Sequence, residues 1–180
     1  GKAIIFLDPL AEQDRAQPDA ASPNVMPVLY SYLDEILEKW GLQISKEKIV
    51  ADINAAMRVQ ASGPRGPQEI DYLPWLRLTE KNFNSEDFST SELNILHMGT
   101  VGAIESIDEK EIKVEITPLI QTSKQSSKLE RDLILFQRDP TVILNNFKSD
   151  DKNILIAARI KGKVQTAFPD GLPIDENEEQ

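Results

Sequence analysis

The stretch Ala3-Ile4-Ile5-Phe6-Leu7-Asp8 decides the fold that the sequence predicts, because it is a continuous apolar run ending in an acid. Such a run is typical of a strand buried on both faces of a sheet. A helix is predicted from Asn24 to Trp40, where apolar residues recur at three- and four-residue spacing. Pro27 is tolerated in its first turn, and Gly41 supplies a left-handed cap. A strand followed by a helix begins an α/β pattern.

Later segments have the alternation or the continuous apolar character of strands. These segments are Leu42–Ile44, Ile49–Asp52, Ala56–Gln60, Leu93–Ile104, Glu111–Ile116 and Asn153–Ile160. Asn84–Asp87 predicts one short turn, and Asp139-Pro140 predicts a capped helix that ends at Phe147. The class expected is therefore α/β with an additional β-rich section.

Two Gly-Pro pairs predict a turn or an exposed loop at residues 61–67, which links two strands. The next segment, Ile70–Leu76, is apolar and aromatic, but Pro74 cannot donate a ladder hydrogen bond. It is predicted to be an edge strand or a packed loop. Residues 9–23 are rich in Ala, Asp, Gln and Pro and predict a loop, either a simple insertion or a functional loop at a strand end.

Composition excludes several classes of function. The 180 residues carry a net charge of −10, which repels a nucleic-acid backbone. No cysteine is present, so there is no disulfide, thiolate site or cysteine nucleophile. No apolar run approaches the roughly 20 residues that span a bilayer. Because the sequence opens inside a predicted strand, we expect an excised piece, with a single domain at 1–168 and an acidic tail or linker at 169–180.

The residues that carry chemistry are sparse. His97 is the only histidine, in a mostly apolar stretch where a sheet residue is expected more often than a general base. Without cysteine, one histidine cannot build an ordinary zinc site, and no glycine-rich phosphate motif is present. No catalytic residue, metal or cofactor is predicted. A hydrolase built from two carboxylates stays an alternative, since glycosidases need no more than that.

Two polar or aromatic groups are candidates for binding. Tyr72, Pro74 and Trp75 combine large contact area with an extended backbone, although Trp75 could instead fill the core beneath a loop. The triplet of Gln121, Thr122 and Ser123 follows a predicted strand and could bond a ligand or simply make a turn.

Several segments together resemble the auxiliary component of gliding-motility-type ABC transporters, the GldG-like family. The segments run in order over nearly the whole chain: Ala3–Leu10, Leu37–Leu42, Ile49–Asp52, Tyr72–Leu76, Ile104-Glu105, Pro118–Ser123, Gly162–Val164 and Ala167–Pro169. The resemblance implies a Rossmann-like or flavodoxin-like α/β sheet with flanking helices. It also implies a place on the extracytoplasmic face of a bacterial inner membrane, beside the permease and ATPase subunits of an ABC transporter.

The same resemblance implies a membrane anchor through segments outside this chain, and it brings no catalytic residues to carry over. The related glutamine amidotransferase-like domains need a cysteine nucleophile, which this sequence lacks. We therefore expect a non-catalytic interaction domain. A soluble ligand-binding domain with a deep apolar pocket near residues 8–19 is a further alternative. Excision also predicts either self-association or an incomplete sheet.

Overall fold

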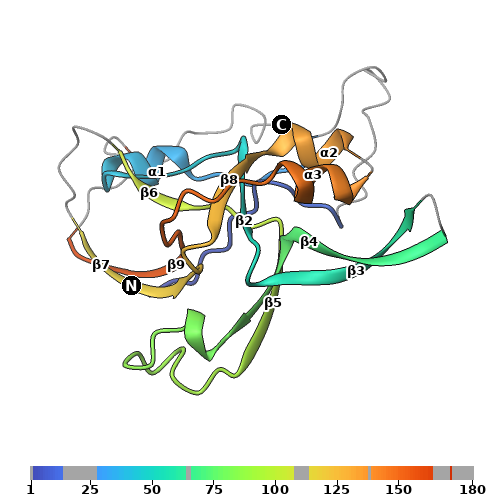
Figure 1. The fold of residues 1–180 in the computed structure, drawn as a ribbon. Helices are drawn as coiled ribbons and strands as arrows, with labels where there is room; N and C mark the ends of the chain where they lie inside the picture. The colour runs from blue at the N-terminus through green and yellow to red at the C-terminus, as the bar shows by residue number, and fades with distance from the viewer. Residues whose placement is uncertain are drawn as a thin grey trace, which may run out of the picture.

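The chain folds into small antiparallel sheets in the computed structural model (Figure 1). The structure describes residues 2–13, 28–63, 66–107, 114–137, 139–163 and 171. The strands are β1 (Leu42–Ile44), β2 (Lys48–Asp52), β3 (Ala56–Gly63), β4 (Gly66–Thr79), β5 (Ile95–Gly99), β6 (Ile104–Ser106), β7 (Glu115–Gln121), β8 (Ser126–Glu130) and β9 (Leu155–Lys161). The helices are α1 (Asp34–Lys39), α2 (Arg131–Phe136) and α3 (Pro140–Asn146), with a 3-10 turn η1 (Glu80–Asn82).

Every strand pair in these residues is antiparallel: β1 pairs with β6, β2 with β8, β7 with β9, and β3, β4 and β5 form one sheet. The predicted Rossmann-like or flavodoxin-like α/β sheet is therefore wrong. Such a sheet needs parallel strands joined by crossover helices. The helices here have six, six and seven residues, so none is long enough to cover a sheet in that way.

The strand predicted at Ala3–Asp8 is also wrong. The side chains of Ile4 and Phe6 are 85% and 87% exposed, and residues 2–8 belong to no strand. Burial begins only at Pro9 and Leu10, which pack into the molecule. An apolar run alone cannot show whether a partner strand lies beside it. None of the described strands pairs with residues 2–8.

Helix α1 is shorter than the predicted helix because the backbone before it forms hydrogen bonds with residues 8–11. The amide of Ser31 donates to the Asp8 carbonyl at 2.8 Å, and the amide of Ala11 donates to the Leu29 carbonyl at 2.7 Å. The helix therefore begins at Asp34, while residues 24–27 lie outside the described part. Gly41 has a φ of +78° directly after the helix, which confirms the predicted glycine cap.

The long β3–β4 hairpin extends away from the other elements (Figure 1), which confirms that two strands are linked here. Residues 61–63 and 66–67 belong to these strands, so the turn or loop predicted over 61–67 is too long. Pro74, however, lies in the middle strand of its sheet, so the edge prediction is wrong. The proline is tolerated because the β3–β4 pairing jumps from Tyr72 to Leu76 at an irregularity, and the pairing with β5 starts only at Trp75. The Pro74 carbonyl still accepts from the Thr100 amide at 2.9 Å.

The single strand predicted at Leu93–Ile104 is divided in two. Thr100 has a φ of +46° and is buried, which turns the chain from β5 in one sheet to β6 in another. Its hydroxyl donates to the Leu10 carbonyl at 2.8 Å. Gly102 follows in a tight place, where an added Cβ would lie 2.7 Å from Ile44 Cγ2. These long-range contacts are invisible in the local pattern.

Other local predictions are confirmed. Turns occupy residues 85–86, and the Asn84 side chain accepts from the Glu86 amide at 3.0 Å. Helix α3 follows Asp139, whose carboxylate accepts from the Thr141 amide at 2.9 Å. Strand β9 matches the apolar segment 153–160, although Ile156 is its only buried residue. Of the predicted acidic tail at 169–180, only Gly171 is described.

The core consists of three apolar clusters, and β2 joins two of them. Val50 packs with Leu76, Leu78, Phe83 and Ile120, whereas its neighbours Ile49 and Ala51 pack with Leu10, Leu73, Ile134 and Ile143. Side chains alternate across a strand, so β2 is covered on both faces. The third cluster, around Leu37, Leu42 and Val114, lies beneath α1. This frame positions the surface loops.

Candidate functional site

The aromatic segment predicted to bind, Tyr72 to Trp75, contacts the N-terminal part of the chain and the core cluster around β2. The Trp75 Nε1 donates to the Glu12 carboxylate at 2.7 Å, and the Tyr72 and Trp75 rings meet edge to face at 5.4 Å. Burial, with a smaller contribution from Glu12, raises the pKa of Tyr72 to about 12. Pro74 is fully buried, while both rings are half-buried. Their role in binding stays a prediction.

The second predicted group lies inside a hydrogen-bond network around Asp52, at the end of β2. The Ser123 amide donates to Asp52 Oδ2 at 2.6 Å, and the Ser123 hydroxyl donates to Oδ1 at 2.8 Å. Thr122 is 2% exposed, and its hydroxyl lies 2.7 Å from the Ser126 hydroxyl. Gln121 ends β7 and its carbonyl accepts from the Asn82 side chain. The structure thus joins Thr122 and Ser123 to β2 and β8, and their predicted binding role remains untested.

The next question is whether the titratable groups of the described residues could form a metal centre. Within the described ranges, no three His, Cys, Asp or Glu side chains lie close enough to hold a metal ion. His97 is an exposed residue of β5, opposite Arg77 of β4. Burial raises the pKa of the Asp8 carboxyl, and the hydrogen bond from the Leu10 amide opposes that rise. Half of the segment at which an apolar pocket is predicted, residues 14–19 of 8–19, lies outside the described part.

The arrangement best suited to recognition lies in the loop between η1 and β5. Asn84 fixes the start of this loop, because its amide donates to the Leu119 carbonyl at 2.9 Å and its side chain donates to the Pro118 carbonyl at 2.8 Å. The Thr90 hydroxyl then donates to the Asn84 carbonyl at 2.8 Å and closes the turn. The loop is therefore tied to β7 along its base.

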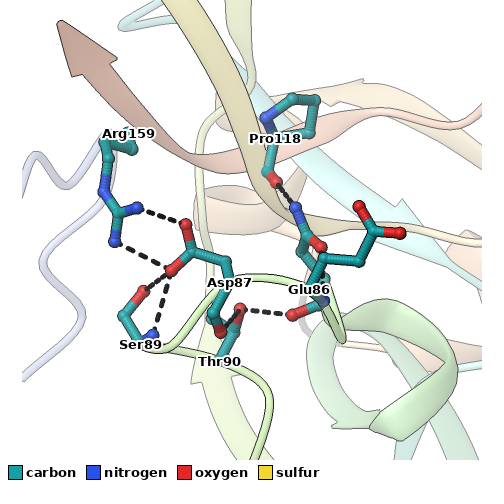
Figure 2. Close-up of polar contacts among 7 residues, drawn as sticks. Glu86, Asp87, Ser89, Thr90, Pro118 and Arg159 are labelled. Carbon is teal, nitrogen blue, oxygen red and sulfur yellow. Dashed lines mark hydrogen bonds and ion pairs between the residues drawn. The ribbon is translucent and has the colours of Figure 1, made fainter.

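Asp87 is the centre of this loop. Figure 2 shows the Arg159 guanidinium facing its carboxylate, with the Nη2 atom donating to Oδ1 at 2.8 Å and Nη1 paired with Oδ2. The Ser89 amide and hydroxyl donate to Oδ1 at 2.9 Å and 2.7 Å. The hydrogen bonds from Ser89, aided by Arg159, lower the pKa of Asp87. The carboxylate is thus held ionised, with its side chain only 4% exposed.

The ion pair of Asp87 and Arg159 lies beside the solvent-exposed aromatic ring of Phe88. Phe88 is 85% exposed, and the Arg159 guanidinium carbon lies 4.7 Å from its ring centroid. A guanidinium over an aromatic face is a favourable cation–π contact, and exposed aromatic and Arg side chains are the groups that dominate protein interfaces. We name Asp87, Phe88 and Arg159 the Phe88 surface. Its exposed groups, an aromatic ring and part of a guanidinium, are suited to contact with another molecule.

Sequence reasoning missed the Phe88 surface. The sequence predicts a short turn that ends at Asp87 and a strand that contains Arg159, and it gives Asp87, Phe88 and Arg159 no role in binding. The one available signal was an aromatic residue between polar neighbours, in the run Glu86 to Ser91. The partner of Asp87 is 72 residues away, and nothing in the local pattern indicates the pairing.

Comparison with known families gives a match over residues 1–180 to the family described as an ABC-type uncharacterized transport system. The chain belongs to this family. Membership in the ABC-type transport-system family indicates an auxiliary component of such a system. No curated protein and no solved structure matches the chain. In the described part of this family member, no helix is long and apolar enough to cross a membrane.

Proposed function

We propose that the chain is a non-catalytic interaction domain of an ABC-type transport system, of the kind linked to gliding motility or surface export. It works on the extracytoplasmic face of the bacterial inner membrane and contacts the permease subunit. The observation that carries this proposal is the family match over all 180 residues. A membrane anchor outside this chain and the ATPase across the membrane complete the proposed assembly.

The Phe88 surface is the proposed point of contact with the permease. Asp87 accepts hydrogen bonds at Oδ1 and is ion-paired with Arg159 through Oδ2, so the loop is ordered before a partner arrives. Binding through a preorganised loop loses less conformational entropy than binding through a loose one. The exposed ring of Phe88 can then transfer its apolar area into a pocket of the partner.

Photo-crosslinking at position 88 tests this contact. A benzophenone amino acid replaces Phe88 in the full-length protein, in cells that also contain its permease and ATPase partners. We expect a light-dependent adduct between the domain and the permease, because the side chain at position 88 is 85% exposed. The adduct is detected by immunoblotting and identified by mass spectrometry.

The same substitution at Phe136 is the matched control, since Phe136 is also an exposed phenylalanine, at 67%, on helix α2. Equal permease adducts from both positions would contradict a specific contact at Phe88. An adduct from position 88 that contains only a second copy of the chain would replace the permease with self-association.

Thiol labelling tests the proposed location. The 180 residues contain no cysteine, so Lys152→Cys places one thiol in this part of the protein, at an exposed position before β9. In cells whose outer barrier is permeabilised, a membrane-impermeant maleimide should label this variant as fully as it does after complete lysis. Protection from the reagent until the inner membrane is broken would place the domain on the cytoplasmic side.

A further inference from the structure

A groove of about 510 Å³ lies on the β3–β4–β5 sheet, on residues that the Phe88 surface does not use. Its chemistry comes from six of its lining residues: Ile53, Met57, Arg58, Asp71, Arg77 and His97. The groove lies beside the irregularity in β4, where Leu73, Pro74 and Trp75 have no partner in β3. A bulge of this kind bends a strand and redirects its side chains, which opens space on the sheet.

The ion pairs among the described residues of the groove involve Arg58 and leave Arg77 without a partner. Arg58 lies opposite Asp71 and its Nε is 3.4 Å from that carboxylate, with Glu69 at 3.9 Å from the same guanidinium. Arg77 lies opposite His97 and is exposed, and it has no ion pair within the described part of the chain. Its backbone is held in place, because its amide donates to the Ala55 carbonyl at 2.7 Å.

A free guanidinium therefore faces the groove of a protein whose net charge is −10. The planar fork of Arg matches the two oxygens of a carboxylate. Ile53, which is 39% exposed, and Met57 provide apolar contact beside it. Asp71 in the same groove disfavours a doubly charged phosphate more than a singly charged carboxylate.

We propose that this groove binds a small carboxylate that carries an apolar group, with Arg77 as the carboxylate ligand and Ile53 and Met57 against the apolar part. Arg77 and His97 are cross-strand partners, so the imidazole lies beside the bound carboxylate. The site is separate from the Phe88 surface and does not depend on the proposed transport partner.

His97 provides the assay, because it is the only histidine and its ring protons give one imidazole signal set. Hexanoate is titrated into the 180-residue protein at constant pH, and the His97 signals are followed by proton NMR. We expect a saturable shift with a dissociation constant on the order of millimolar. Hexanol, which lacks the charge, should give no saturable shift, and inorganic phosphate should not displace hexanoate at equal concentration.

Arg77→Gln should weaken hexanoate binding about tenfold or more, since a hydrogen bond to a charged group is lost. Arg77→Lys, which keeps the charge but not the fork, should bind with intermediate affinity. Lys124→Gln removes the same charge from an exposed position outside the groove and should bind like the wild type. Circular dichroism checks that each variant is folded.

Three results would overturn the proposal: Arg77→Gln binding as tightly as the wild type, Lys124→Gln losing as much affinity as Arg77→Gln, or hexanol producing the same saturable shift as hexanoate. Displacement of hexanoate by equimolar inorganic phosphate would overturn the assignment of the ligand class.

Discussion

Two buried aspartates in this chain are stabilised in different ways. Asp52, which is fully buried at the end of β2, accepts hydrogen bonds from neutral groups only: the Asn54 amide and the amide and hydroxyl of Ser123. Asp87, 6% exposed in a loop, accepts from Ser89 and is also ion-paired with Arg159. The first carboxylate joins strands in the interior, and the second orders a loop at the surface.

This difference shows which of the two buried aspartates is connected to an exposed side chain. The hydrogen-bond partners of Asp52 lie directly after β2 and in the turn between β7 and β8, so these bonds hold β2 to that turn. The side chain of Arg159 is 38% exposed, and its guanidinium contacts both the Asp87 carboxylate and the Phe88 ring. A buried charge that connects to an exposed aromatic side chain is the stronger candidate for a recognition site.

The largest expected effect comes from Asp52→Ala. This change leaves three donors without an acceptor, two of them on Ser123, and should lower the free energy of unfolding by about 3–5 kcal/mol. Urea denaturation measures the loss, with Glu92→Ala as a control at an exposed acid. A loss equal to that of the control would show that the network around Asp52 is not structural.

Asp87→Asn should cost less, and its cost should depend on pH. Because the pKa of Asp87 is lowered in the folded state, its contribution is present above the unfolded value of about 4 and is lost as pH falls through the folded pKa. The stability gap between wild type and variant should therefore narrow from about pH 6 to about pH 3. Urea midpoints at both pH values test this, with Glu86→Gln as the charge-matched control. A constant gap would contradict the ion pair.

Phe88→Ala should have the smallest effect on stability, no more than about 1 kcal/mol, because only an exposed cation–π contact is lost. The same urea experiment measures it, and Phe136→Ala is the matched control. A loss as large as that of Asp52→Ala would mean that the ring supports the fold, and the contrast between the two aspartates would then fail.

The parts of the fold that depend on local chemistry were predictable. The Gly-Pro pairs at 63–67 predicted a hairpin, Asp139 before Pro140 predicted a capped helix, and Gly41 predicted a helix end. Each of these is fixed by the φ preference or the hydrogen-bonding group of one or two residues. The sheet class was not predictable, because the partner of each strand is set by contacts between distant segments.

Ile4 and Phe6 illustrate the limit, since their apolar run has the composition of a buried strand and yet they are exposed. Thr100 illustrates it as well, because its positive φ is stabilised by Leu10 and Pro74, far away in sequence. The candidate site was missed for the same reason. Asp87 and Arg159 meet only because β9 pairs with β7, to which the loop is tied.

The position of strand β2 between two apolar clusters affects how the molecule unfolds. Val50 belongs to one apolar cluster, and its two neighbours belong to another, so detaching this strand uncovers both clusters in a single event. The small sheets around it should therefore melt together and not one after another. Amide protons of residues 49–51 are then expected to exchange with solvent more slowly than those of Gln68 and Glu69, which are exposed near the start of β4.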